Sequence, residues 1–251
     1  MPASEAKDRL RKSLEHLPRV ALSDLPTPLH DCPRFSDALG GKVRVLIKRD
    51  DLTGLALGGN KTRKFDFVMA DAQAAGATTV ITGAASQSNH ARQAAAAAAR
   101  LGMKCVLVNR HDHRSQAGIQ GNLLLDYILG ADVRLVEDGN QSAVKEQVAE
   151  ELRRQGEVPY IIGSRAVALG TAAYAGCVLE IADQLEAMDV ETDYLCTASG
   201  TGTHAGLILG AKALEMATEV HGYTPSRGDA GRRREGVAAM ANQAAELLGL
   251  D

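Results

Sequence analysis

Aromatic residues are scarce in this chain. Phe, Trp and Tyr together make up 3% of its 251 residues, and Trp is absent. The core must therefore be built from Ala, Leu, Val and Ile, which the 45% hydrophobic content supplies. With 24% charged residues, the composition is typical of a soluble globular protein. The length suits one large α/β domain or two smaller ones.

An excess of charge and long apolar runs are also missing. The formal net charge is -3, and the densest basic spot is Arg232–Arg234. We interpret this triplet as a helix surface, because nucleic-acid binding needs a wider basic footprint. No stretch of 18 apolar residues occurs, so we expect no membrane-spanning helix. The charged N-terminus lacks the apolar segment of a signal peptide, so we expect a cytoplasmic protein.

Cysteines are few and far apart. The four are Cys32, Cys105, Cys177 and Cys196, and they form no CxxC pair. Cys105 and Cys196 lie in apolar, strand-like runs, so buried free thiols fit better than disulfides or zinc ligands. The histidines of His111-Asp112-His113 are expected to face solvent on a loop, and we predict no metal site.

From about residue 43 onward, short apolar runs alternate with helical stretches. We expect strands at 43–48, 78–82, 104–109, 132–136, 160–162, 194–197 and 220–224. We expect helices at 61–75, 89–101, 119–129, 142–154, 171–188, 203–215 and 233–248. This alternation, with short connections, predicts an α/β fold with parallel sheets and helices on both faces.

The first stretch with chemical character is LGGNKTRK, residues 57–64. Its two glycines let the backbone turn tightly and approach a ligand, and Asn60 can cap a helix beginning at Lys61. The positive end of that helix, with Arg63 and Lys64, disfavours the charged form of Lys61. A neutral amine is what Schiff-base chemistry needs. The alternative is a glycine turn before a helix with an exposed basic edge.

The second stretch is GAASQSNH, residues 83–90, directly after a predicted strand. Ser88 or Asn89 can cap the Ala-rich helix that follows, and uncovered amides at its start can hold a carboxylate. Asn89 can also donate to an anionic oxygen, and Ser88 adds a hydroxyl. Simple capping of the helix is the alternative, and His90 alone is more typical of a local structural histidine.

The third stretch is ASGTGTHAG, residues 198–206, which again follows a strand and opens a helix. Its glycines expose backbone amides, its hydroxyls supply donors, and the helix dipole favours a dianion, so we predict a phosphate site. It lacks the GK[ST] of a Walker loop and the spacing of a dinucleotide fingerprint. A glycine-rich turn without a ligand is the alternative.

Together the three stretches form a set at the carboxyl ends of strands, where open α/β sheets bind ligands. They supply a reactive lysine, a carboxylate site and a phosphate site. A phosphate-bearing aldehyde cofactor acting on an amino acid explains all three. This set indicates pyridoxal 5'-phosphate bound as a Schiff base on Lys61.

Longer segments around these stretches resemble the D-cysteine desulfhydrase and 1-aminocyclopropane-1-carboxylate (ACC) deaminase family. They are IKRDDLTGLALGGNKTRKFDFVMADA, GAASQSNHARQAAAAAARLGMKC and ASGTGTHAGL, with LPTPLHDCPRFSDALGG near the N-terminus. The resemblance runs over nearly the whole chain. It implies the tryptophan-synthase β-like fold of fold type II pyridoxal-phosphate enzymes, with two parallel-sheet α/β domains.

The resemblance also implies a domain division. Residues 1–51 and 166–251 would form a larger domain that holds the cofactor phosphate, and residues 52–165 a smaller α/β domain. Family members continue for about a further quarter of their length, so we expect the larger domain to be incomplete in this chain. Homodimers are usual in the family, and we expect one here.

By the same resemblance, Lys61 is the Schiff-base lysine and the base that takes the α-proton. Asn89 would hydrogen-bond the phenolic oxygen of the cofactor. The residues that would face the substrate carboxylate are Ser88, a second catalytic candidate, and its neighbours Gln87 and His90. The residues that would cradle the phosphate are Gly200, Thr201, Gly202 and Thr203, with Lys64 nearby as a counter-charge.

The resemblance predicts a lyase acting on a small amino acid. The histidines of SNH and GTH resemble the desulfhydrase branch, which favours elimination from D-cysteine to give pyruvate, ammonia and sulfide. ACC deamination and cysteate sulfo-lyase activity are alternatives within the class. An alternative of another class is a shortened, non-catalytic relative that binds a small molecule or a partner.

Overall fold

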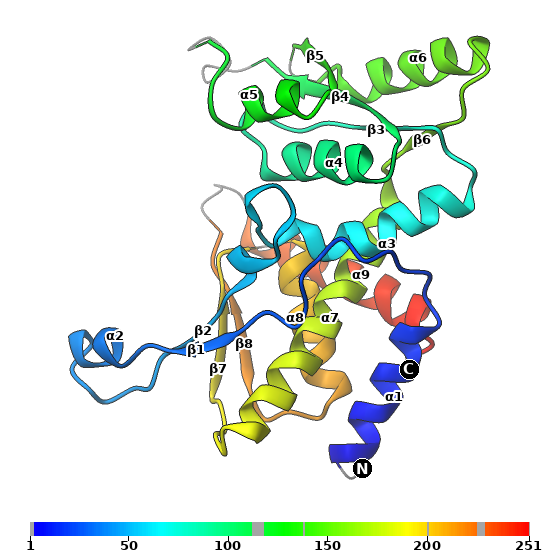
Figure 1. Ribbon diagram of the computed structural model, residues 1–251. Coiled ribbons are helices and arrows are strands. Elements are labelled where there is room, and N and C mark those ends of the chain that lie inside the picture. The colour runs from blue at the N-terminus through cyan, green and yellow to red at the C-terminus, as the bar shows by residue number, and fades with distance from the viewer. Residues whose placement is uncertain (1–2, 112–117, 138, 200, 225–228, 251) are drawn as a thin grey trace. The chain divides into compact units, whose positions relative to one another are not determined.

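The computed structural model describes residues 3–111, 118–137, 139–199, 201–224 and 229–250 (Figure 1). The chain forms two compact units. Residues 1–17, 24–60 and 167–251 make up the terminal unit, and residues 18–23 and 61–166 make up the central unit. The division into domains at 51/52 and 165/166 stays a prediction.

The central unit contains a four-stranded parallel sheet with strand order β5-β4-β3-β6. Its strands are β3 (Thr79–Thr82), β4 (Lys104–Arg110), β5 (Asp132–Val136) and β6 (Pro159–Ile161). Parallel neighbours need crossover connections, and three helices supply them: α4 (Asn89–Arg100), α5 (Gly121–Ile128) and α6 (Gln141–Arg154). Helix α3 (Lys61–Ala74) precedes the first strand of this sheet. Each of these elements lies within a few residues of its predicted position.

The terminal unit contains two two-stranded sheets. Parallel strands β7 (Tyr194–Thr197) and β8 (Glu219–Gly222) form one, and antiparallel strands β1 (Leu29–Asp31) and β2 (Leu46–Lys48) the other. Its helices are α1 (Ala3–Glu15), α2 (Pro33–Ala38), α8 (Gly202–Ala213), α9 (Ala230–Leu248) and most of α7 (Ser164–Ala187). Two short 3-10 turns lie at Asp50–Leu52 and Leu55–Leu57.

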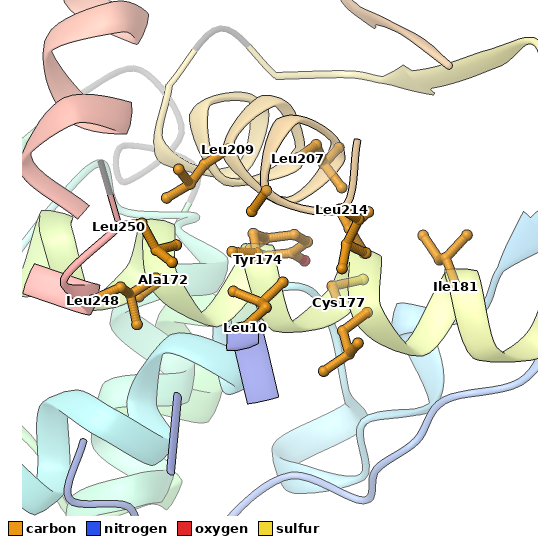
Figure 2. Packing of buried hydrophobic residues seen from close by; sticks show 14 of the residues in the cluster. Leu10, Ala172, Tyr174, Cys177, Ile181, Leu207, Leu209, Leu214, Leu248 and Leu250 are labelled. Atoms are coloured by element: carbon orange, nitrogen blue, oxygen red, sulfur yellow. The ribbon is translucent and has the colours of Figure 1, made fainter. Parts of the chain in front are cut away.

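Helix α7 is the centre of the apolar core of the terminal unit (Figure 2). By length and composition it could cross a membrane, yet 67% of its most apolar window is buried inside the fold. It packs against apolar side chains of three other helices. Among them are Leu10 of α1, Leu207 and Leu209 of α8, and Leu248 of α9. The apolarity of α7 is therefore accounted for by its place in this core.

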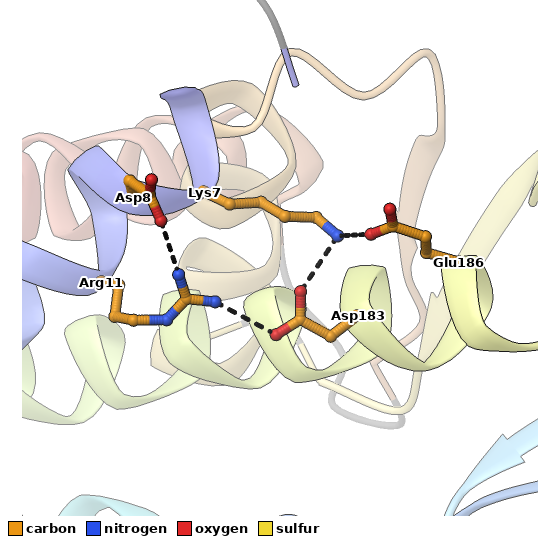
Figure 3. A network of polar contacts seen from close by, with 5 residues as sticks. All are labelled: Lys7, Asp8, Arg11, Asp183 and Glu186. Carbon is orange, nitrogen blue, oxygen red and sulfur yellow. Dashed lines mark hydrogen bonds and ion pairs between the residues drawn. The ribbon is translucent and has the colours of Figure 1, made fainter. Parts of the chain in front are cut away.

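An ionic network joins α1 to the C-terminal end of α7 (Figure 3). Lys7 Nζ lies 3.0 Å from Asp183 Oδ1 and 2.5 Å from Glu186 Oε2. Arg11 bridges Asp8 of its own helix, at 2.8 Å, and Asp183, at 3.3 Å. Asp183 is therefore shared by two cations from α1.

Several sequence expectations need correction. Helices α1 and α2 and strand β1 were not expected, and β2 pairs with β1 in an antiparallel rather than a parallel arrangement. Strand β2 also covers only the last three residues of the predicted 43–48. Helix α7 begins at Ser164, seven residues before the predicted start, because tertiary packing extends it through Gly170 despite the low helix propensity of glycine.

The cysteines are free, but one differs from the expectation. Cys105 and Cys177 are buried, whereas Cys196 is exposed, because alternate residues of β7 point away from the helices. Across the described ranges no group of three or more His, Cys, Asp or Glu side chains is placed so that it could hold a metal ion. Asp112 and His113 of the loop considered for metal binding lie outside the described residues.

Candidate active site

Lys61 is the first residue of α3 and follows an unusual turn. Residues 56–59 all have positive φ, including the non-glycine residues Ala56 (46°) and Leu57 (68°). A Cβ on Gly58 would lie 2.0 Å from the carbonyl oxygen of Asp51, so this position requires glycine. Such strain persists where the surroundings hold it, often at functional sites. The turn thus delivers Lys61 to the helix start in one defined position.

Asn60, the residue before Lys61, is anchored inside the terminal unit. Its Nδ2 donates to Thr203 Oγ1 at 3.3 Å. The Tyr174 hydroxyl lies 3.3 Å from the Asn60 carbonyl oxygen and 2.7 Å from Asp50 Oδ2. Because one peptide bond joins Asn60 to Lys61, the predicted Schiff-base lysine directly follows a residue that donates to Thr203 of the predicted phosphate loop.

Burial shifts the lysines of α3 toward the neutral form. It lowers the pKa of Lys61, and it lowers the pKa of Lys64 to about 8, with the charge of Lys61 adding to the effect. Neither ammonium has an ion-pair partner among the described side chains, although Lys64 lies 5.6 Å from the ring centre of Phe65. The pKa of Lys61 is lowered, as predicted, and desolvation is its main cause.

His90 is packed rather than free. Its ring stacks on Phe65, with centroids 5.2 Å apart, and its Nε2 lies 3.0 Å from Thr82 Oγ1. Burial, and then the charges of Lys64, Lys61 and Lys145, lower the pKa of His90 well below its ordinary value. His90 is therefore neutral near pH 7 and does not offer a cation to a carboxylate. Lys145, which the sequence analysis did not single out, brings a third positive charge to this group.

Ser88, one of the two predicted caps, is the N-cap of α4. Its Oγ accepts from the backbone amides of His90 at 3.1 Å and Ala91 at 3.3 Å. These are two of the amides that were expected to hold a substrate carboxylate. In this structure they donate to the Ser88 cap instead. Asn89, the first residue of α4, is exposed, and the Ser88 hydroxyl hydrogen can still be donated.

Both polar ends of the Gln87 side chain are engaged by the start of α5. Gln87 Nε2 donates to the Gln120 carbonyl at 3.0 Å, and Gln87 Oε1 accepts from the Asn122 amide at 2.9 Å. In this arrangement the Gln87 side chain contacts the start of α5, and its role at a substrate carboxylate stays a prediction. Nothing local in the sequence linked residues 87 and 122, because 35 positions separate them.

The predicted phosphate loop lies at the start of α8. Thr201 is the N-cap with an extended backbone and makes no side-chain capping bond, so no side chain of the cap covers the first amides of α8. The Thr201 amide donates to Ser199 Oγ at 3.3 Å. The hydroxyls of Thr201 and Thr203 flank this helix start, which suits a dianion. Gly200, the other predicted cradle residue, lies outside the described residues.

Comparison with known families assigns the chain. Residues 20–249 match the family described as pyridoxal-phosphate dependent enzyme. The chain belongs to this family.

Relatives of this pyridoxal-phosphate enzyme include ACC deaminases. It is 40% identical over 248 residues to the 1-aminocyclopropane-1-carboxylate deaminase of Burkholderia cenocepacia, covering 95% of this chain and 73% of the relative. It is 39% identical over 243 residues to the putative 1-aminocyclopropane-1-carboxylate deaminase of Pyrococcus abyssi, covering 95% of this chain and 72% of the relative. The chain thus spans about three quarters of these relatives.

Comparison with solved structures supports the same family. An ACC deaminase homologue superposes with a TM-score of 0.85 at 38% identity, covering 97% of this chain and 73% of that one. A threonine deaminase from T.th., at 24% identity and a TM-score of 0.60, covers 87% of this chain and 64% of its own, and shares the fold alone. The predictions of family, fold type II architecture, pyridoxal phosphate and a lyase or deaminase class are confirmed.

The site residues of this pyridoxal-phosphate enzyme fit the cofactor. Lys61 supplies an amine of lowered pKa for an aldehyde. The start of α8, with no side-chain cap and two threonine hydroxyls beside it, suits the phosphate. Asn89 is exposed and can donate to the phenolic oxygen. The roles of the individual residues stay predictions.

Proposed function

We propose that this chain is a lyase that converts a small amino acid into a 2-keto acid and ammonia, with ACC as its substrate. The observation that carries the proposal is Lys61, a partly buried amine of lowered pKa joined to a residue that contacts the phosphate-loop threonine. Relatives about 40% identical, named as ACC deaminases, support the choice of substrate. We propose that the molecule works as a homodimer, as its resemblance implied.

The bound cofactor supplies an aldehyde for attachment and a ring that withdraws electrons from the substrate. Lys61 Nζ would hold the cofactor through its aldehyde and, once free, would serve as the base. ACC carries no hydrogen on its α-carbon, so Lys61 would take a proton from a ring methylene as the ring opens. The first turn of α8 would hold the phosphate, Asn89 would orient the phenolic oxygen, and Lys64 would add positive charge.

D-Cysteine is the second candidate substrate. His90 follows Asn89 and His204 follows Thr203, the pattern that resembles the desulfhydrase branch. D-Cysteine has a hydrogen on its α-carbon, which Lys61 would remove before the thiolate leaves. Its products are pyruvate, ammonia and sulfide, whereas ACC gives 2-oxobutanoate and ammonia, so the keto acid identifies the reaction.

The test compares the wild-type protein with Lys61→Ala and with Lys42→Ala, a matched change at an exposed lysine. Wild type and Lys42→Ala should take up pyridoxal phosphate, and borohydride should trap it on the peptide that contains Lys61. Lys61→Ala should lose this label and at least about 100-fold in keto-acid release. ACC, D-cysteine and cysteate are the substrates assayed.

Two results would count against this proposal. Label on another lysine, or no cofactor uptake by the wild type, would remove Lys61 from the chemistry. Uptake at Lys61 without turnover of any of the three substrates would favour the non-catalytic relative that binds a small molecule.

A further inference from the structure

Asn122, the second residue of α5, gives all its side-chain hydrogen-bonding groups to the segment that carries Asn89. Its Nδ2 donates to the Gln87 carbonyl at 3.0 Å and to Asn89 Oδ1 at 2.9 Å. Its Oδ1 accepts from Arg92 Nη1 at 3.1 Å. A side-chain amide has two N–H donors and one carbonyl acceptor, and here each has a partner.

The contact with Arg92 determines which end of the Asn122 and Asn89 side-chain amides is the oxygen and which is the nitrogen. A guanidinium only donates, so the atom of Asn122 that faces Arg92 must be the oxygen. The nitrogen of Asn122 then faces Gln87 and Asn89. The atom of Asn89 that meets this nitrogen must be an acceptor, which leaves Asn89 Nδ2 as the outward end. The hydrogen-bond chain from Arg92 through Asn122 therefore assigns the orientation of Asn89.

The close approach of α5 to this segment is built into the backbone. Gly121 has φ +57°, and a Cβ there would lie 2.5 Å from Gln87 Oε1. With the bonds from Gln87 to Gln120 and from Asn122 back to Gln87, the two segments hold each other at several points. Asn122 thus has a defined place from which to act on Asn89.

We propose that Asn122 is a positioning residue that makes Asn89 present an N–H donor, rather than a carbonyl, to the phenolic oxygen of the cofactor. This inference rests on the proposed function, which places that oxygen at Asn89. A donor stabilises negative charge on the oxygen, and a reversed amide would set a carbonyl oxygen against it. Asn122 acts only through Asn89 and does not touch the cofactor.

Asn122→Asp is the decisive variant. Aspartate keeps an acceptor for Arg92, and its charge is favourable near a helix N-terminus, so we expect the fold to be retained. It cannot donate to Asn89 Oδ1, and it accepts from Asn89 Nδ2 instead, which reverses the amide. We expect the dissociation constant for pyridoxal phosphate to rise about tenfold or more. Asn140→Asp, at the start of α6 with no side-chain capping bond, is the matched control and should stay within about twofold.

A double-mutant cycle separates positioning from simple charge repulsion. In an Asn89→Ala background, Asn122→Asp should have no further effect on cofactor binding. In the cofactor-free protein, the side-chain NH2 resonances of Asn89 should move in Asn122→Asp, whereas those of Asn242 on α9 should not.

The outcomes are distinct. Equal binding by Asn122→Asp and wild type, or a loss that persists in Asn89→Ala, would overturn the inference while leaving the proposed function intact. A wild type that takes up no cofactor would overturn the proposed function. The NMR comparison would then still show whether Asn122 sets the orientation of Asn89.

Discussion

At the scale of single residues, burial dominates the electrostatics of the central unit. Asp126 on α5 is fully buried, and its Oδ2 accepts from Asn109 Nδ2 at 3.3 Å. Its Oδ1 has no hydrogen-bond partner within the described part of the chain. Burial raises the pKa of Asp126 to about 7, and the Asn109 bond and the charge of Arg92 offset only part of this effect.

This shift predicts a pH-dependent stability. An unfolded aspartate has a pKa of about 3.9, so the folded state binds the proton more tightly. The contribution of Asp126 is most favourable below about pH 4, declines as the pH rises to about 7, and is level above that. Asp126→Asn should therefore be more stable than wild type at pH 8, by about 1 to 4 kcal/mol, with a smaller difference near pH 5.

Urea unfolding of both proteins between pH 5 and 8 measures this difference. Taking the difference between variant and wild type cancels the titration of other carboxylates. A stability difference that does not change with pH would mean that Asp126 is charged throughout, and that its surroundings impose no penalty on the charge.

At the scale of elements, glycine residues of α8 allow this helix to pack closely on α7. A Cβ on Gly206 would lie 2.3 Å from the Thr171 carbonyl oxygen and 2.4 Å from Tyr174 Cβ. Gly202 has a milder contact, 3.2 Å from Thr171 Oγ1. The close approach of the two helices also places the first turn of α8, the predicted phosphate site, beside Asn60, which donates to Thr203.

Two glycine-to-alanine substitutions test this packing. Gly206→Ala should destabilise the protein by about 1 to 3 kcal/mol, because the added methyl group has no space. Gly236→Ala on α9, where a Cβ would meet nothing within 4 Å, should be neutral or stabilise by up to about 1 kcal/mol. Thermal unfolding of the two variants decides the matter, and similar melting temperatures would show that α8 can move away from α7 at little cost.

At the scale of the whole chain, the network around Asp183 joins helices that are far apart in sequence. Lys7 is the least exposed member, with a side chain 16% exposed, whereas Asp183 is 48% exposed. Pairs of this kind contribute modestly, and salt screens them. Because α1 also inserts Leu10 into the core, the network adds to an attachment that is mainly apolar.

Asp183→Asn should lower the free energy of unfolding by about 1 kcal/mol at low salt, since it removes the carboxylate shared by Lys7 and Arg11. The loss should shrink at high salt. Asp8→Asn, which breaks only the contact to Arg11 within α1, should change stability by less than about 0.5 kcal/mol. Equal effects of the two substitutions, or a loss that is independent of salt, would argue against an ionic link between α1 and α7.

The sequence by itself determined what depends on neighbours along the chain. Periodicity, capping and turn chemistry are local. They predicted the helix start at Lys61, a cap at Ser88 or Asn89, the strand–helix alternation of the central unit and the glycine-rich opening of α8. The motifs around these residues were also enough to indicate pyridoxal phosphate and the enzyme family.

Only the tertiary structure decided what depends on distant residues. The pairing of β1 with β2 and the contacts of Asn122 with Gln87 and Asn89 join segments that are far apart in sequence. The exposure of Cys196 likewise depends on which side of β7 the rest of the fold covers. The direction of the pKa shift of Lys61 was predicted, but its main cause was not. Its cause is desolvation, and desolvation depends on which side chains the whole fold packs around the amine.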